Sequence, residues 1–133
     1  MDKEYFFKTD QLVIWRPSGI LDTVRIKEFI GFIDVNTEQR DPHFSRFIDL
    51  SQISGISVNY EDVVPIVQQR KSYSTNHIKR KVKMAFLVHN PISFGMARMY
   101  QMLYDDPLFE INIYESREEV SDYLEVDVSI LVP

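Results

Sequence analysis

The run Val82–Val88 is the most hydrophobic stretch of the sequence and restricts the fold more than any other feature. A strand buried on both faces explains this run better than a half-exposed strand, which would alternate apolar and polar residues. Strands of that kind occur in parallel sheets whose two faces are covered by helices. The sequence therefore favours an α/β fold.

Short β-prone runs alternate along the chain with longer segments of helical periodicity. Strands are predicted at residues 5–9, 12–15, 44–50, 82–88 and 110–114. Helices are predicted at residues 24–35, 63–76, 91–104 and 116–124. Residues 51–60 are polar and are expected to be irregular. This order predicts a mostly parallel sheet of about five strands with an antiparallel N-terminal strand and four helices, in a single domain over residues 1–133.

Capping residues mark where the helices should begin. Asp22 or Thr23 can cap the first helix, Asp62 the second and Ser116 the last, because their side-chain oxygens accept hydrogen bonds from free backbone amides. With Asp62 as the cap, Pro65 would lie in the first turn, where its missing N–H is not needed.

Composition excludes several classes of function. The chain has 133 residues, a hydrophobic content of 44% and no cysteine, which excludes disulfides, thiolate metal sites and a cysteine nucleophile. The net charge of −5 argues against nucleic acid as the main partner. The first residues are charged and no apolar segment follows them, so we expect a cytoplasmic protein without a signal peptide.

The sequence contains no motif of a known catalytic or metal site. His43, His77 and His89 are dispersed, and none has a second ligand at the spacing typical of a metal site. His89 and Asp49, both near strand ends, are the only pair that would merit a test for catalysis. We therefore expect no enzymatic activity, no metal and no cofactor.

One basic run, His77–Lys83, follows Arg70 and Lys71 in this acidic chain. Such a run can attract a lipid headgroup or a phosphate. A charge run is more often a solvated loop, and here it precedes a predicted strand.

The predicted helix at residues 91–104 is rich in apolar residues. Helical spacing predicts a core stripe of Ile92, Met96, Met99 and Leu103, with Tyr100 and Met102 on its flanks. Phe94 falls on the opposite side, one turn before Arg98. Phe32 likewise lies off the stripe of the first helix, which comprises Ile26, Phe29, Ile30 and Ile33.

Two helices with a second apolar face indicate a binding surface. The predicted ligand-binding residues are Phe32, Phe94, Arg98 and Met102. Phe32 and Phe94 would supply apolar contacts, Arg98 would meet an anionic headgroup and Met102 would adapt to the shape of the ligand.

Several segments resemble the bacterial SpoIIAA-like (STAS-like) family. The most specific is Asn90–Gln101, and weaker likenesses lie at Phe47–Ser51, at Ala85–Val88 and around Trp15. The resemblance implies a βα superhelical sheet with helices largely on one face, a fold shared with anti-anti-sigma factors and with CRAL-TRIO (SEC14) lipid-binding domains. It implies no established enzymatic activity.

The sequence departs from the anti-anti-sigma pattern at one point. Those proteins carry an Asp-Ser-Ser-Gly run with one phosphorylated serine, and Ser57–Tyr60 occupies that place here. Without a hydroxyl at the matching position a phosphoserine switch cannot operate, unless the register differs and Ser54 or Ser57 replaces it.

Two functions remain open from the sequence. The first is a non-enzymatic binding domain for a small apolar or lipid-like ligand, or for a membrane surface. The alternative is a STAS-type regulatory module that binds a protein partner through an interaction loop and that lacks the usual phosphorylatable serine motif. The candidate residues of this loop are Asp49, Ser51, Ser54 and Ser57. A sheet with helices mainly on one face would also leave a surface for a homodimer.

Overall fold

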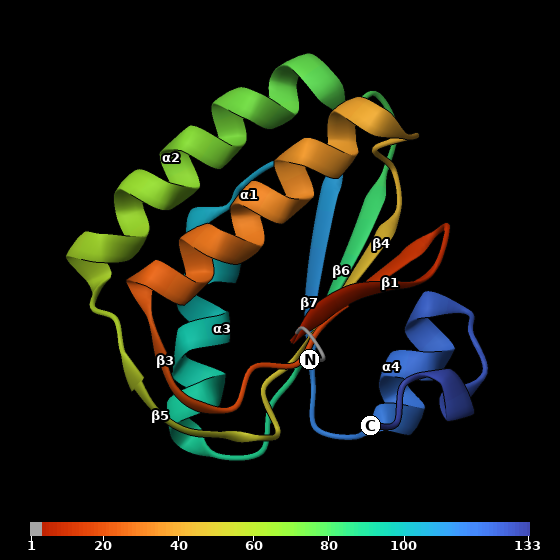
Figure 1. Ribbon diagram of the computed structural model, residues 1–133. Helices are drawn as coiled ribbons and strands as arrows, with labels where there is room; N and C mark the ends of the chain where they lie inside the picture. The colour runs from red at the N-terminus through yellow and green to blue at the C-terminus, as the bar shows by residue number, and fades with distance from the viewer. Residues whose placement is uncertain (1–3) are drawn as a thin grey trace.

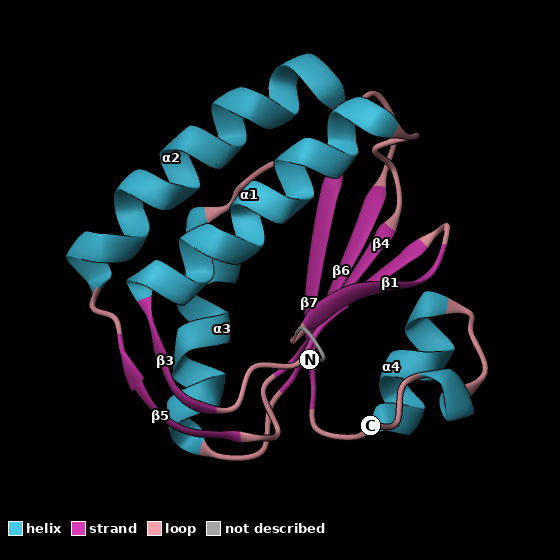
Figure 2. Cartoon of the chain, viewed as in Figure 1, coloured by secondary structure: helices cyan, strands magenta, loops and turns pink. Residues whose placement is uncertain are grey.

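Five strands form the main sheet, in the order β1-β2-β4-β6-β7 (Figures 1 and 2). The structure is a computed structural model that describes residues 4–133, and the charged residues 1–3 lie outside the described residues. The strands are β1 (Tyr5–Thr9), β2 (Leu12–Trp15), β4 (Ser45–Asp49), β6 (Val82–Leu87) and β7 (Phe109–Tyr114). β1 pairs antiparallel with β2, and the other neighbours are parallel, which confirms the predicted α/β fold.

Three helices cover one face of this sheet and one covers the other (Figure 1). The first group is α1 (Thr23–Gln39), α2 (Tyr60–His77) and α3 (Pro91–Leu103). On the opposite face lie α4 (Arg117–Leu124) and the short 3₁₀ helix η1 (Val128–Ile130). No helix within residues 4–133 combines the length and the apolar character needed to cross a membrane.

A small second sheet is absent from the sequence prediction. β3 (Gly19–Asp22) pairs in parallel with β5 (Ile53–Ser57), so the prediction that residues 51–60 are irregular is wrong. Gly19 starts β3 with a φ of 71°, a left-handed conformation that glycine adopts readily. The two strands are short and lie far apart in the chain, and only the fold brings them together.

The two faces of the main sheet bury separate apolar cores, because side chains alternate between faces along each strand. Val13, Trp15 and Ile48 pack under α1, α2 and α3. Leu12 and Phe47 pack under α4 and η1. The sheet is therefore buried on both sides, as the run Val82–Val88 predicts.

The helix caps are largely the predicted ones. Asp22 caps α1 and Ser116 caps α4. In α2 the cap is Asn59, and Asp62 is the third helical residue, whose side chain accepts from the Asn59 amide. The prediction of Asp62 as the cap is therefore wrong by one turn. Pro65 consequently lies inside the helix rather than in its first turn.

The buried side of α3 overlaps the predicted stripe but is rotated by about one position along the helix. Met96, Met99 and Leu103 pack against the first core as predicted. The most buried residues are Ser93, Ala97 and Tyr104, whereas Ile92 is 61% exposed. One residue is a rotation of about 100° around a helix. Two small side chains allow the helix to approach closely, and the rings of Tyr100 and Tyr104 fill the space beside it by packing on Phe86 and Phe109. The predicted stripe is therefore confirmed for Met96, Met99 and Leu103 and wrong for Ile92.

Candidate functional site

An apolar cavity of about 60 Å³ lies between α1, α2, α3 and the main sheet. The sheet contributes Trp15 from β2 and Phe86 from β6, and the helices contribute Phe29 and Met96 among others. Trp15 stacks on Phe29, with ring centroids 4.5 Å apart. Among the residues that line the cavity, Trp15 and Tyr100 are the two whose side chains carry an N–H or O–H group.

A second space of about 40 Å³ adjoins the cavity and is polar at one end. The two share four residues in their walls: Phe29, Ile30, Met84 and Tyr100. Arg46 and Arg70 line only the second space. We call these two neighbouring spaces the chamber; Arg46 and Arg70 line its smaller part.

Arg46 is an unusual residue for its position in the fold. It lies on the central strand β4 and is 4% exposed, with its guanidinium over the rings of Phe44 and Phe109. Its Nη1 donates to the Phe44 carbonyl at 2.7 Å, and its Nη2 reaches the Pro42 carbonyl at 3.5 Å. Arg46 forms no ion pair with any residue in the range 4–133.

Burial, together with the positive charge of Arg70, lowers the pKa of Arg46 to about 10. The group is therefore still protonated at neutral pH. A charge removed from water without a counter-ion costs several kcal/mol, so this arrangement opposes folding rather than stabilising it.

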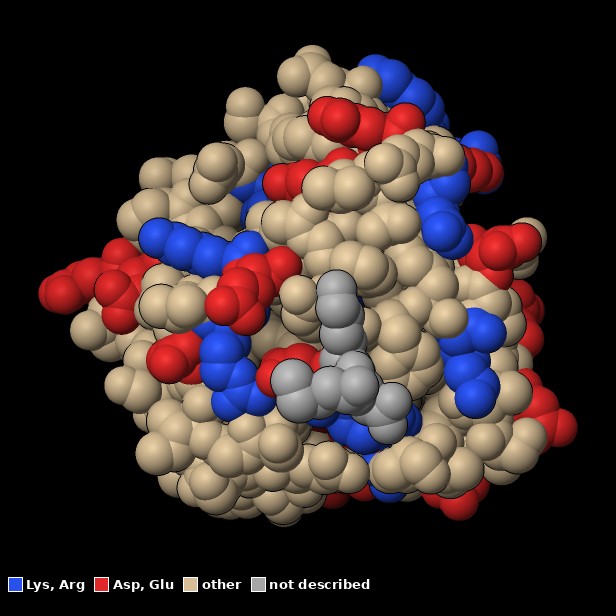
Figure 3. Space-filling model, viewed as in Figure 1, with Lys and Arg blue, Asp and Glu red and all other residues tan. Residues whose placement is uncertain are grey.

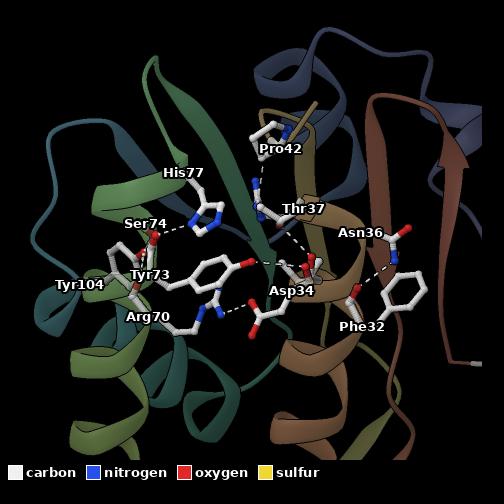
Figure 4. A network of polar contacts seen from close by, with 12 residues as sticks. Phe32, Asp34, Asn36, Thr37, Pro42, Arg70, Tyr73, Ser74, His77 and Tyr104 are labelled. Carbon is white, nitrogen blue, oxygen red and sulfur yellow. Dashed lines mark hydrogen bonds and ion pairs between the residues drawn. The ribbon is translucent and has the colours of Figure 1, made fainter. Parts of the chain in front are cut away.

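A polar bridge connects α1 to α2 and includes Arg70, which lines the smaller space (Figure 4). Arg70 of α2 forms an ion pair with Asp34 of α1, and the Tyr73 hydroxyl donates to the Asp34 carbonyl at 3.3 Å. On the far side Tyr104 hydrogen-bonds Ser74 and donates to the Arg70 carbonyl at 3.3 Å. The bridge holds the two helices together and orients Arg70.

The four predicted ligand-binding residues lie in two different surroundings, Phe32 against β1 and the other three on the exposed side of α3. Phe32 packs on β1, with ring centroids 4.8 Å from Tyr5 and 5.7 Å from Phe7. It therefore packs against the first core, and it is not among the residues that line the space with Arg46 and Arg70.

The other three predicted residues are exposed on α3. Arg98 hydrogen-bonds Gln101 of the same helix, and Met102 is 65% exposed. Phe94 is 45% exposed and lines an open hollow of about 630 Å³, together with His89 and other residues at the carboxyl ends of β6 and β7. Ile20, Ile92 and Phe94 are all exposed. Figure 3 shows few charged side chains at its lower left, where Figure 1 places β3, β5 and the start of α3.

Asp49 and Ser51, the first two residues of the predicted interaction loop, belong to a buried charge cluster. Asp49 is fully buried and accepts from Arg16 Nε at 2.8 Å and from Arg117 Nη2 at 2.9 Å. Arg117 also donates to the Ser51 hydroxyl. These groups are occupied by contacts within the fold. Ser54 and Ser57, in contrast, are exposed on β5.

Asp49 has a pKa below its ordinary value. Burial by itself raises the pKa, but the hydrogen bonds from Ser51 and Arg16, with the charge of Arg117, outweigh that effect. The carboxylate is thus ionised and fully paired, and it does not contact His89, which is exposed and lies beside the Asn90 amide. The predicted catalytic pair is therefore not assembled.

The other titratable clusters are surface ion pairs. His43 contacts Asp41, and Arg80 of the basic run pairs with the same carboxylate. Lys81 pairs with Glu110, so much of the positive charge of the run is neutralised in place. In residues 4–133 no group of three or more His, Asp or Glu side chains gathers as a metal site would require.

The sequence analysis missed Arg46 and Arg70 as site residues. The available signal was the position of Arg46 in the predicted strand, where alternation places it on the same face as Phe44 and Ile48. A charged residue on an apolar face of a predicted central strand indicates a buried charge. Arg46 is buried here because helices cover the face toward which it points.

Comparisons with protein-family models, with curated proteins and with solved structures found no match for this chain. The resemblance to the SpoIIAA-like family therefore stays a prediction. The site is interpreted from its geometry alone.

Proposed function

We propose that the protein is a non-enzymatic binding domain that holds a small, mostly apolar ligand in the chamber between α1, α2, α3 and the main sheet. The observation that carries the proposal is the wall of this chamber, which consists of aromatic and aliphatic side chains from three helices and three strands. Binding sites for small molecules are typically concave and apolar, with a few polar groups that fix orientation.

The size of the chamber limits the ligand. Its two parts measure about 60 and 40 Å³, whereas an engineered cavity that binds benzene measures about 150 Å³. A ligand larger than a few non-hydrogen atoms enters only if α1 and α2 separate. The bridge of Asp34, Arg70 and Tyr73 is the contact that such a movement would strain.

The first test is native mass spectrometry of the purified protein, compared with its mass after denaturation. We expect a bound mass that disappears on denaturation, and the same spectra report whether the chain forms a homodimer. Ile30→Trp fills the space shared by both parts of the chamber and should remove the bound mass. The matched control is Val35→Trp on the exposed side of the same helix, where Val35 is 54% exposed.

The variant Phe94→Asp tests whether the ligand binds in the chamber or in the open hollow at the strand ends. A ligand held in the chamber stays bound in this variant, since Phe94 lines only the hollow. Loss of the bound mass in Phe94→Asp but not in Ile30→Trp would place the ligand in the hollow and contradict the proposed site. A bare mass for the unmodified protein would contradict ligand binding as purified.

A regulatory interaction module is the second candidate, favoured by the exposure of Ser54 and Ser57 on β5. Both hydroxyls lie in a two-stranded sheet outside the main one, where a kinase or a partner could reach them. Phosphate incorporation that is lost in the double variant Ser54→Ala, Ser57→Ala would support this function. Incorporation elsewhere, or none, would contradict it.

A further inference from the structure

We propose that the ligand carries a single carboxylate, which binds between the Arg46 guanidinium and the Tyr100 hydroxyl at the polar end of the chamber. This inference rests on the proposed function and adds the chemical class of the ligand, a small apolar monocarboxylic acid. Three observations carry it: an unpaired buried charge, the local charge balance and an unused hydroxyl group.

The buried charge is that of Arg46. Its guanidinium is desolvated, stacked over two aromatic rings and bonded only to backbone carbonyls within residues 4–133. A guanidinium has five N–H donors in a planar fork that matches a carboxylate. Arg46 therefore has donors left over for an anion, and an anion would remove the cost of the unpaired charge.

The local charge balance selects a monoanion. Arg46 and Arg70 bring two positive charges to the space, and Asp34 neutralises one of them through its ion pair with Arg70. One positive charge remains. A carboxylate matches it, whereas a phosphate monoester carries about −1.5 to −2 at neutral pH and would leave an excess of negative charge in a desolvated site.

The Tyr100 hydroxyl supplies a neutral donor at the same place. It has no hydrogen-bond partner in the described residues, although its ring is packed between Phe86 and Tyr104. Tyr100 lines both parts of the chamber, so its hydroxyl marks the boundary between the apolar body and the polar end. An acid with its apolar body against Trp15 and Phe86 would point its head toward Arg46.

The test uses Trp15, the single tryptophan of the chain, as the reporter, because it lines the apolar part of the chamber. Bromine quenches tryptophan fluorescence on contact, so the probe is 4-bromophenylacetate and its neutral counterpart is 4-bromophenylacetamide. We expect the acid to quench Trp15 and to bind at least about tenfold more tightly than the amide, since a hydrogen bond to a charged group contributes more than a neutral one.

Substitutions test whether Arg46 causes the preference for the acid over the amide. Arg46→Gln should abolish the preference for the acid, and Arg46→Lys should restore part of it because the charge is retained. Arg98→Gln is the matched control: Arg98 was the headgroup partner predicted from sequence, and it is exposed on the outer side of α3. Circular dichroism of each variant shows whether the fold is kept.

Each outcome decides between the two proposals. Equal affinity for acid and amide on the unmodified protein would overturn the carboxylate and leave the apolar chamber standing. Both probes exceed the closed volume, so they enter only when α1 and α2 separate. No quenching by either compound would overturn the chamber as a site that opens for a ligand, and the carboxylate with it. A preference for the acid that is lost in Arg98→Gln but kept in Arg46→Gln would overturn the role of Arg46.

Discussion

Two charged side chains on β4 show how differently one strand can hold a buried charge. Asp49 is surrounded by Arg16, Arg117 and Ser51, and all of these stabilise its ionised form. Arg46, three residues earlier on the opposite face, has only carbonyl oxygens and aromatic rings. The first residue therefore stabilises the fold, and the second needs an external partner. Substitution at the two sites should have opposite effects.

Asp49→Asn should lower the free energy of unfolding by about 3 kcal/mol, because it leaves Arg16 and Arg117 without their counter-ion. Urea denaturation at neutral pH measures this loss. The matched control is Asp105→Asn, which changes an exposed aspartate and should stay within about 0.5 kcal/mol of the unmodified protein. A loss below 1 kcal/mol at Asp49 would contradict the role of the cluster.

The same carboxylate predicts a dependence of stability on pH. Its pKa is lower in the folded than in the unfolded chain, so its contribution is complete above the unfolded value of about 4 and is lost as the pH falls through the folded value. The unmodified protein should lose stability below about pH 4 more steeply than Asp49→Asn. Parallel acid limbs for the two proteins would contradict the lowered pKa.

Arg46→Met should raise the free energy of unfolding of the ligand-free protein by about 1–2 kcal/mol, because replacement of a buried charge by an apolar side chain is often stabilising. Thermal and urea unfolding measure the change, with Arg98→Met as an exposed control. A loss of more than 1 kcal/mol at Arg46 would show that its carbonyl bonds and ring contacts stabilise the fold, and would remove the main reason to expect an anion there.

At the scale of elements, local signals fix the helices and the central strands but not the small sheet. Capping residues and apolar periodicity place α1 and α4 within a few residues of their observed bounds. β3 and β5 lack such signals, because each is short and is stabilised by the other. The face that α3 buries is predicted only in part, since Ser93 and Ala97 are buried whereas Ile92 is exposed.

Two glycines in adjacent elements should respond to alanine in opposite directions. Gly19→Ala should destabilise the protein by roughly 1 kcal/mol, because Gly19 has a φ of 71° at the start of β3. Gly31→Ala should stabilise it by about 0.5–1 kcal/mol, because Gly31 is exposed within α1. An added Cβ meets no atom within 4 Å at either position, so urea unfolding isolates the backbone effect. Changes of the same sign would contradict this explanation.

At the scale of the whole molecule, the sheet separates two cores with different roles. The core under α1, α2 and α3 contains the chamber and its buried arginine. The core under α4 and η1 is closed by Leu131, which is fully buried although it is close to the end of the chain. The Leu131 carbonyl accepts from Arg16, whose Nε also donates to Asp49. The C-terminal segment is thereby tied to the charge cluster.

Leu131→Ala should lower the free energy of unfolding by about 2–3 kcal/mol, as expected for a leucine removed from a packed core. The adjacent control Val132→Ala should change it by less than about 0.5 kcal/mol, because Val132 is 49% exposed. Chemical denaturation of both variants provides the measurement. Equal effects at the two positions would show that the end of the chain contributes little to the second core.

The sequence by itself determined the order of the main elements and the parallel character of the sheet. The run Val82–Val88, the caps and the helical periodicity are local properties. They depend on residues close together in the sequence, so they can be read without the tertiary structure. The binding residues were selected because they lie off the predicted core stripes. In the structure Phe32 packs on β1, whereas Phe94, Arg98 and Met102 are exposed on α3. Only the tertiary structure decided that Arg46 is buried and that Tyr100 lies beside it. Burial of a charge depends on which helices cover a strand, and that is set by packing between segments far apart in the chain.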